Sequence, residues 1–406
     1  WGLLLFCCKL GSRRQLDFDL RDPATQVLRN VNRLAGTRQA TLPVHDTLDH
    51  FLHHLGSAPL AALRTQMVRR LIRMKVLDGA RLLGRVVVAI DGTGHLHFRR
   101  RHCPQCLVRQ HPAYDAYLHM VEEAKLLGPG GLGLSLGTAF IENADRPSPV
   151  GRAPEAWKQD CELAAFRRLV PALRQAYPQT AVCVTSDALY ACAPAVRLVE
   201  AQGWSYVFTF KAGNAPTAWA EFQAVVALCP ENTLRLTLPD GTQQVYRWAT
   251  GMSSDDGTGR SAYGFNALRC EETVKETTTT TFVWMTNLPV TRDTVVPIAM
   301  KGGRRRWTIE AGFNVQKNSE LNLEHAYSTD PELIKAYYYL LQIAHMMLQL
   351  LERGSLLRRL AQRHGKTPLA LFGSLKNIAR RLLEALRHHL LPDEPRPAIQ
   401  IRFDTS

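Results

Sequence analysis

Two short apolar runs, each ending in an aspartate, constrain the fold of this chain more than any other feature. Residues 85–90 (Arg-Val-Val-Val-Ala-Ile) lead into Asp91, and residues 181–185 (Ala-Val-Cys-Val-Thr) lead into Ser186 and Asp187. Runs rich in β-branched residues and bounded by turn residues predict buried strands. If the two strands are adjacent, their ends place both carboxylates side by side. For either aspartate alone, the alternative is a turn or a helix cap.

The segments around these runs predict an alternation of strands and helices. A second strand at 95–100 would form a hairpin with the first through the Gly-rich turn at 91–94, and a third strand fits 132–141. Helical periodicity at 157–177 and 193–202 flanks the strand before Asp187, and 204–211 predicts a further strand. The order β-β-β-α-β-α-β, with acids at strand ends, predicts an α/β domain with an RNase-H-like mixed sheet.

We divide the chain into five parts. They are a helical N-terminal segment (1–80), the first part of the catalytic domain (81–230), a β-rich insertion (231–300), a helix with its closing helices (301–352) and a basic helical C-terminal segment (353–406). The insertion predicts antiparallel strands at 233–238, 243–249, 263–270 and 277–285.

The N-terminal segment predicts helices at 25–35, 46–56 and 58–78, the second capped by Thr47. It is either a truncated DNA-binding region of the helix-turn-helix type or a lid on the next domain. Because the sequence begins at Trp1, we expect the natural start to be missing.

The charge balance predicts a polyanionic partner. Lys and Arg number 50 against 36 Asp and Glu, a net charge of +14. Nucleic acid is the first expectation and an anionic membrane surface the second. The apolar runs at 3–8 and 337–351 are too short to span a bilayer, and no secretory signal is evident. Nine cysteines, an odd number scattered over 406 residues, favour a reducing cytoplasm over a disulfide framework.

A third acid lies in a helix-like segment, residues 304–317. Arg306, Glu310, Phe313 and Lys317 are spaced to share one helix face. Glu310 belongs either to a solvated ion-pair ladder or to a buried edge, and the apolar residues at 307, 309 and 313 favour the buried edge. Cutting DNA calls for two divalent metals roughly 4 Å apart, held by such carboxylates.

The segment RWTIEAGFNVQK resembles the third catalytic motif of bacterial insertion-sequence DDE transposases, Tyr-x2-Arg-x3-Glu-x6-Lys. Arg306, Glu310 and Lys317 match its spacing, whereas Gly303 stands at the Tyr position. VAIDGTG and CVTSDALY resemble the strands that carry the first two acids, and FVWMTNLP resembles the strand leading to the Glu helix. The resemblance covers about residues 85–350, and the 123 residues from Asp187 to Glu310 match the β-rich insertion of that family.

This resemblance implies a DNA transposase. Asp91, Asp187 and Glu310 would bind two Mg²⁺ ions, with Mn²⁺ able to substitute, and would cleave DNA at the element ends and transfer the strand into target DNA. Arg306 and Lys317 would hold phosphates. We expect a homodimer in the DNA complex and a bacterial, cytoplasmic protein that is associated with the nucleoid when bound to DNA. Two alternatives are a nuclease of the same fold without strand transfer and a catalytically inactive or repurposed copy that only binds DNA.

Further candidates for DNA contact are Lys211, which would meet phosphates, and Trp248, which would stack on an unpaired base. The alternatives are an ordinary surface charge for Lys211 and a core aromatic for Trp248. The acids Glu142, Asp160 and Glu162 resemble catalytic members, but for the last two a charged first helical turn is the preferred interpretation.

A possible structural zinc site begins at His102-Cys103-Pro-Gln-Cys106. A tetrahedral site needs four ligands, so Cys103 and Cys106 would be joined by two residues from among His102, His111 and Cys161. His95 and His97 also lie nearby in sequence, on one face of the predicted strand. The alternative is a hairpin end with His and Cys packed in the core.

Overall fold

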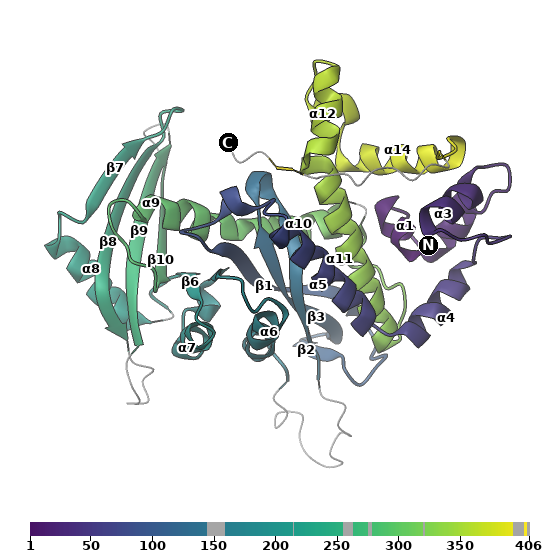
Figure 1. Ribbon diagram of the computed structural model, residues 1–406. Coiled ribbons are helices and arrows are strands. Elements are labelled where there is room, and N and C mark those ends of the chain that lie inside the picture. Colours follow the sequence, from purple (N-terminus) through teal and green to yellow (C-terminus); the bar gives the residue numbers. More distant parts are fainter. Residues whose placement is uncertain are drawn as a thin grey trace, which may run out of the picture.

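The computed structural model describes residues 1–143, 159–213, 215–254, 263–274, 278–319, 321–392 and 402–403. The described strands form one mixed, ten-stranded sheet with helices on its faces (Figure 1). Their order is β2-β3-β1-β5-β6-β10-β9-β8-β7, and β4 pairs with β3. The strands are β1 (Val86–Phe98), β2 (Leu107–His111), β3 (Tyr114–Leu127), β4 (Gly133–Ile141), β5 (Val182–Ser186), β6 (Ser205–Thr209), β7 (Thr233–Thr237), β8 (Gln243–Ser254), β9 (Tyr263–Val274) and β10 (Thr278–Thr286).

The centre of the sheet is parallel and covered on both faces. β1 runs parallel to β5, and β5 parallel to β6, whereas β3 is antiparallel to both β1 and β4. Alternate residues of β1 enter different cores, as the two-residue period of a strand requires. Val88 and Ile90 pack with α6 (Glu162–Ala176) and α7 (Ala193–Ala201), while Val87 and Ala89 pack on the opposite side with residues of α10 (Trp307–Asn318). Burial on both faces explains the continuous apolar run that predicts this strand.

The predicted hairpin at 91–94 is wrong. β1 continues through Asp91-Gly-Thr-Gly to Phe98, with a register shift between Gly94 and Leu96. The chain turns back only after this strand, into β2, and the long strand β3 then pairs with β1, β2 and β4. The glycines do not make a turn, because β3 supplies backbone partners along the whole segment, Gly92 opposite Glu122 among them. The bulge also separates His95, which is buried, from His97, which is exposed, so the two do not share a face.

The predicted strands of the insertion are all present, and they extend the central sheet. β10 pairs antiparallel with β6 at one side and with β9 at the other, so β7 to β10 continue the sheet outward (Figure 1). The helix α8 (Pro216–Leu228) packs against β8. After β10, the short helix α9 (Val295–Pro297), the π-helical turn η5 (Ile298–Gly303) and the 3-10 turn η6 (Arg304–Arg306) lead into α10.

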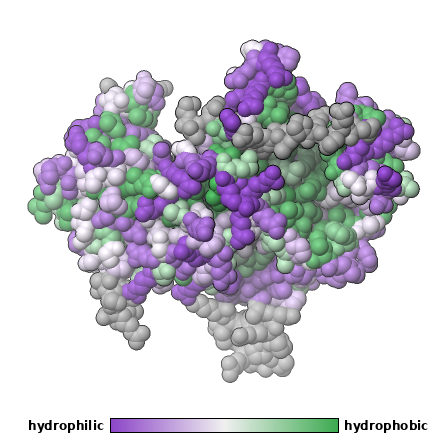
Figure 2. Space-filling model, in the orientation of Figure 1, coloured by the Kyte–Doolittle hydropathy of each residue, from purple (hydrophilic) through white to green (hydrophobic). Residues whose placement is uncertain are grey.

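The N-terminal segment is helical, as predicted, and packs on the long helix α11 (Pro331–Arg353) through a second apolar core. Thr47 is not a cap, because the helix begins two residues earlier, at His45. Figure 2 shows hydrophobic side chains gathered between α11 and the helices α1 and α4. The helices here are α1 (Gly2–Cys7), α2 (Arg13–Leu20), α3 (Val27–Ala35), α4 (His45–Leu55) and α5 (Ala58–Arg73).

The C-terminal segment is helical as far as it is described, with α12 (Ser355–Arg363), α13 (Pro368–Phe372) and α14 (Leu375–His388). The α3 side chain of Asn30 donates hydrogen bonds to the carbonyls of Leu386 and His389, which ties the two ends of the chain together. Among the described residues, no helix combines the length and apolar character needed to cross a bilayer.

Candidate active site

Asp91 lies in β1, and Asp187 directly follows the end of the neighbouring parallel strand β5. The β1–β5 register ends with Ala89 opposite Thr185, and each aspartate comes two residues after this last pair. The Asp91 carboxylate accepts a hydrogen bond from the backbone N–H of Gly92 at 3.0 Å. The Asp187 carboxylate accepts one from the N–H of Leu189 at 2.8 Å and so caps a short turn. The cap interpretation therefore holds for Asp187, and one carboxylate oxygen remains for other partners.

Glu310 reaches this edge from α10, which packs against β1. Ile309 and Phe313 anchor the helix in the core, whereas Trp307 is 51% exposed and not part of a buried edge as expected. The Glu310 side chain is half exposed, and its Oε1 lies 2.6 Å from Nη1 of Arg306. Both sequence interpretations therefore hold for part of this helix: one side, with Ile309 and Phe313, is buried, and Glu310 forms an ion pair with Arg306.

The electrostatics join the three acids. Burial raises the pKa of Asp91 to about 7; Arg306 opposes the shift, while Glu310, Asp187 and Glu162 add to it. A carboxyl held near neutrality by burial and by other acids is typical of a functional site. Among the described residues, the group of side chains gathered closely enough to hold a metal ion is a His/Cys cluster described below, and it does not include Asp91, Asp187 or Glu310.

Two further acids belong to this region: Glu162, which the sequence interpretation assigned to a charged first helical turn, and Glu122, which it missed. A Cβ at Gly92 would lie 2.3 Å from Oε1 of Glu162, so that carboxylate rests directly on the β1 backbone beside Asp91. Glu122, opposite Gly92 in β3, accepts a hydrogen bond from the Tyr190 hydroxyl at 2.6 Å and keeps its other oxygen unpartnered. Burial, followed by the charge of Asp187, raises the pKa of Glu162. The sequence offered one signal, the position of Glu162 at the start of a helix, and it was assigned to the helix itself.

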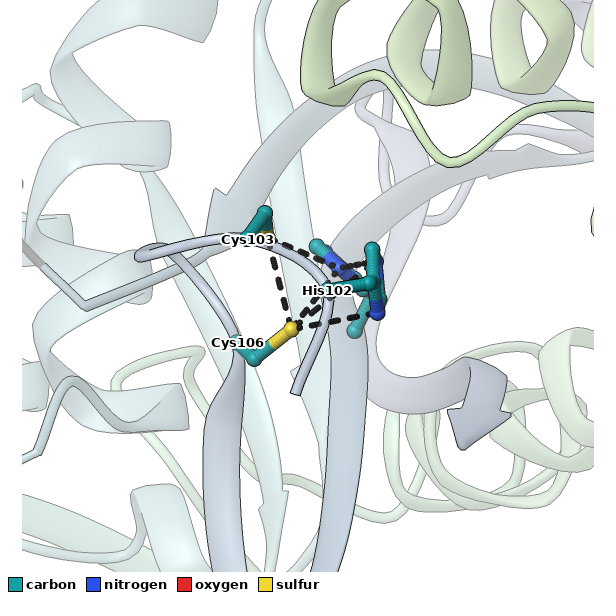
Figure 3. A group of neighbouring side chains, drawn as sticks. His102, Cys103 and Cys106 are labelled. Atoms are coloured by element: carbon teal, nitrogen blue, oxygen red, sulfur yellow. Dashed lines mark hydrogen bonds between the residues drawn. The ribbon is translucent and has the colours of Figure 1, made fainter. Parts of the chain in front are cut away.

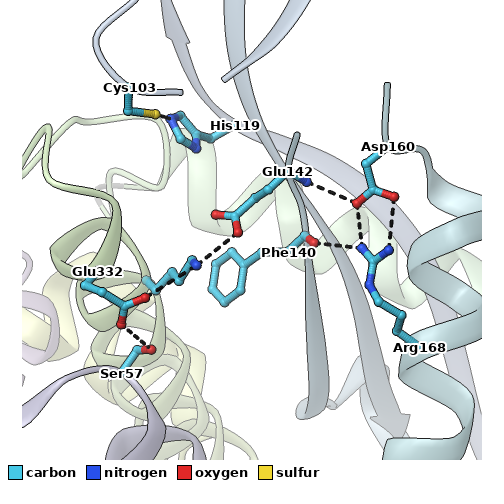
Figure 4. A network of polar contacts seen from close by, with 9 residues as sticks. Ser57, Cys103, His119, Phe140, Glu142, Asp160, Arg168 and Glu332 are labelled. Carbon is cyan, nitrogen blue, oxygen red and sulfur yellow. Dashed lines mark hydrogen bonds and ion pairs between the residues drawn. The ribbon is translucent and has the colours of Figure 1, made fainter. Parts of the chain in front are cut away.

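Glu142 and Asp160 both have structural partners, and Asp160 lies before α6 rather than in its first turn, where only Glu162 of the two predicted acids is found. The Glu142 carboxylate pairs with Lys335 at 2.9 Å, and its backbone N–H donates to Asp160. Asp160 in turn accepts two hydrogen bonds from Arg168, one at 2.6 Å (Figure 4). These contacts fix the end of β4 to α6 and α11.

A lysine that sequence analysis did not single out lies beneath the site. Lys125, in β3, is fully buried, its ammonium has no hydrogen-bond partner among the described residues, and it lies 4.1 Å from the ring centre of Phe313. Burial lowers its pKa to about 8, against the opposing charges of Glu123 and Asp91. Its nitrogen would also lie 3.0 Å from a Cβ at Gly312, so α10 approaches β3 closely at that glycine.

The predicted DNA-contact residues are placed differently from one another. Lys211 is exposed, Arg306 is nearly buried against Glu310, and Lys317 pairs with Glu324 at 3.0 Å. Trp248 is only 5% exposed and packs in the core of the outer strands, which is the alternative interpretation, so its ring face is closed to a base.

The departure from the third motif at Gly303 has a steric cause. A Cβ at this position would lie 2.2 Å from Cε2 of Trp284 in β10. The indole therefore occupies the space that any side chain at this position would need.

A second cluster gathers metal-ligating residues away from the acids. His102, Cys103, Cys106 and His119 bring their ligand atoms within 4.8 Å of one another, an arrangement that could hold a metal ion (Figure 3). This cluster includes the predicted Cys103, Cys106 and His102 but not the other two candidates, His111 and Cys161. His111 stacks on Tyr114 at the β2–β3 turn, and Cys161 is exposed at the start of α6. The fourth ligand, His119, comes from β3, a strand that the sequence did not predict.

Comparison with known proteins adds no family. The chain matches no protein-family model, and no curated protein matches it.

Proposed function

We propose that this chain is a DDE-type DNA transposase built on an RNase-H-like sheet. The observation that carries the proposal is the coupling of three acids in the expected order: Asp91 in β1, Asp187 just after the adjacent parallel strand β5, and Glu310 on a helix packed against β1, with the charges of Asp187 and Glu310 acting on Asp91. The order β1, β3, β4, α6, β5, α7, β6 also follows the pattern of that fold, with β2 as an addition.

The chemistry follows from the placement of these carboxylates. Asp91, Asp187 and Glu310 would hold two Mg²⁺ ions, which activate the attacking water or 3′-OH and stabilise the leaving oxygen in an in-line displacement. Burial is the main cause that raises the pKa of Asp91, and the charges of the neighbouring acids add to it; a bound cation would offset the repulsion among these acids. Glu162 would lie beside the first metal ligand.

DNA is the proposed partner. The net charge of +14 supports it, and exposed Lys211 and the basic helices α12 and α14 offer phosphate contacts. Trp307, rather than Trp248, is the aromatic exposed beside the acids: it is 51% exposed and has Arg304 5.0 Å from its ring centre. An exposed ring next to a guanidinium is suited to stacking on an unpaired base.

The test is a joining assay on supercoiled plasmid with a labelled oligonucleotide that carries a free 3′-OH. The wild type is expected to nick DNA and to transfer the label in Mg²⁺ or Mn²⁺ but not in EDTA. Glu310→Gln should abolish both reactions and keep DNA affinity, because Lys and Arg contacts to phosphates supply most of it. The matched control is Glu221→Gln, on the exposed side of α8.

Three other outcomes would refute parts of the proposal. Nicking without label transfer identifies a nuclease of the same architecture, and DNA binding without either reaction identifies a copy that only binds. Normal cleavage by the Glu310→Gln variant would show that this carboxylate is structural.

A further inference from the structure

Four side chains that could bind a metal ion come together at the turn between β1 and β2. His102, Cys103 and Cys106 come from this turn, and His119 comes from β3, where it pairs with Leu96 of β1. Cys103, Cys106 and His119 are each less than 10% exposed. Figure 4 shows His119 reaching from its strand to Cys103, 3.5 Å from ring Nε2 to sulfur.

Five of the six distances among the four ligand atoms are close to the edges of a tetrahedron around zinc, and the sixth, from Cys103 to His102, is below 4.8 Å. With Zn–S near 2.3 Å and Zn–N near 2.0–2.1 Å, tetrahedral edges are about 3.8 Å for S–S, about 3.6 Å for S–N and about 3.3 Å for N–N. The corresponding distances are 3.3 Å between the two sulfurs, 3.5 to 3.8 Å from sulfurs to ring Nε2 atoms, and 3.1 Å between the Nε2 atoms of His102 and His119. All five agree within about half an ångström.

The other interpretations of the cluster fit less well. The sulfurs are too far apart for a disulfide bond, which needs about 2.05 Å. Without a cation, two thiols and two imidazoles would lie packed against one another at contact distance. Two sulfurs and two ring nitrogens in tetrahedral array are the donor set of Zn²⁺. Four protein ligands leave no open position, which is the pattern of a structural site.

We propose that His102, Cys103, Cys106 and His119 bind one Zn²⁺ that pins the β1–β2 turn to β3. The surrounding contacts extend this clamp toward the candidate active site. Asn143, after β4, donates to the carbonyl of Cys106 at 2.8 Å, and the Gln159 side chain pairs with both backbone groups of Val108. Gln159 lies three residues before Glu162, the first residue of α6, so the metal would help to fix the segment that leads into this helix.

The test measures the zinc content of the purified 406-residue chain by inductively coupled plasma mass spectrometry. One zinc per chain is expected in the wild type, in Cys161→Ser and in His111→Ala, the two candidates outside the cluster. Cys106→Ser and His119→Ala should lose it. The Asp91→Asn variant should keep its zinc, because Asp91 is not a ligand of this site. If the proposed Mg²⁺ site at Asp91 is wrong, the zinc content is still expected to be one per chain.

A second measurement covers variants that do not fold. Wild-type protein stripped of metal and loaded with Co²⁺ should show the thiolate charge-transfer band and the intense visible bands of a tetrahedral ion. Wild-type protein that holds no zinc after refolding with it, a Cys103–Cys106 disulfide in fresh protein, or full zinc content in the His119→Ala variant would each overturn the proposal.

Discussion

Replacing Asp91 by asparagine should stabilise the protein at neutral and alkaline pH. Burial raises the pKa of Asp91 from 3.8 to about 7, so folding must work against ionisation of this carboxyl. In the unfolded chain the group ionises above about pH 4, whereas in the folded protein it keeps its proton until about pH 7. The stability of the wild type therefore falls as pH rises between these values and levels off above them.

The magnitude follows from the two pKa values. At 1.36 kcal/mol per pKa unit, the interval from 3.8 to about 7 corresponds to about 4 kcal/mol. Asp91 is only partly buried, and solvent screening reduces the expected gain of Asp91→Asn to about 2 kcal/mol. For a chain of 406 residues, that is a rise in melting temperature of roughly 2 °C. Asparagine keeps an oxygen that can accept from the Gly92 N–H, so the local backbone contact survives.

The assay is thermal unfolding of both proteins in EDTA from pH 4.5 to 8.5. The difference in melting temperature should be near zero at the acid end, grow towards pH 7 and then stay constant. Asp293→Asn is the control, since Asp293 is exposed and is not among the charges that act on Asp91. A variant no more stable than the wild type at pH 8, or a gain independent of pH, would refute the argument from burial.

Three further changes test other parts of the structure. Gly303→Ala places a Cβ 2.2 Å from Trp284 and should destabilise the protein by about 1–3 kcal/mol, measured by denaturant unfolding, whereas Gly11→Ala, with no atom within 4 Å of its Cβ, should not. Lys125→Met removes a buried cation and should raise stability at pH 7 by about 1–3 kcal/mol; an unchanged or lower melting temperature would mean that the ammonium is well compensated. Lys317→Ala should weaken DNA binding and reduce the slope of log K against log salt by about 0.9, and an unchanged slope would place this face of α10 away from the DNA backbone.

The elements that carry the acids could be predicted from sequence because their patterns are local. The strand before Asp187 and the helix with Glu310 show their period within ten residues, and the structure has both where expected. β1 was cut short because Gly92 and Gly94 suggest a turn when seen alone. Only the pairing with β3, a contact between residues distant in sequence, keeps the segment extended.

β3 itself could not be predicted for a physical reason. Glu122, Glu123 and Lys125 interrupt its apolar pattern, and charged residues normally mark a surface. Here the two glutamates are buried with hydrogen-bond donors: Tyr190 donates to Glu122, and the hydroxyls of Ser135, Thr138 and Tyr338 donate to Glu123. Lys125 lies over the ring of Phe313 instead. The same strand carries His119. Because the sequence does not predict β3, it also does not predict the fourth member of the His/Cys cluster.

The continuity of the sheet has a mechanical consequence for the third acid. β10 shares backbone hydrogen bonds with β9 on one side and with β6 on the other, and its Trp284 fills the space beside Gly303 where the chain enters α10. The outer strands are thus not a hinged flap. A force on these strands, such as that from a long ligand bent across the protein, would be transmitted through the backbone hydrogen bonds of β9 and β10 to the turn at Gly303, which precedes the helix that carries Glu310. The outermost strands are therefore coupled to α10 through β10, and binding of a ligand at these strands would also affect the position of the Glu310 side chain.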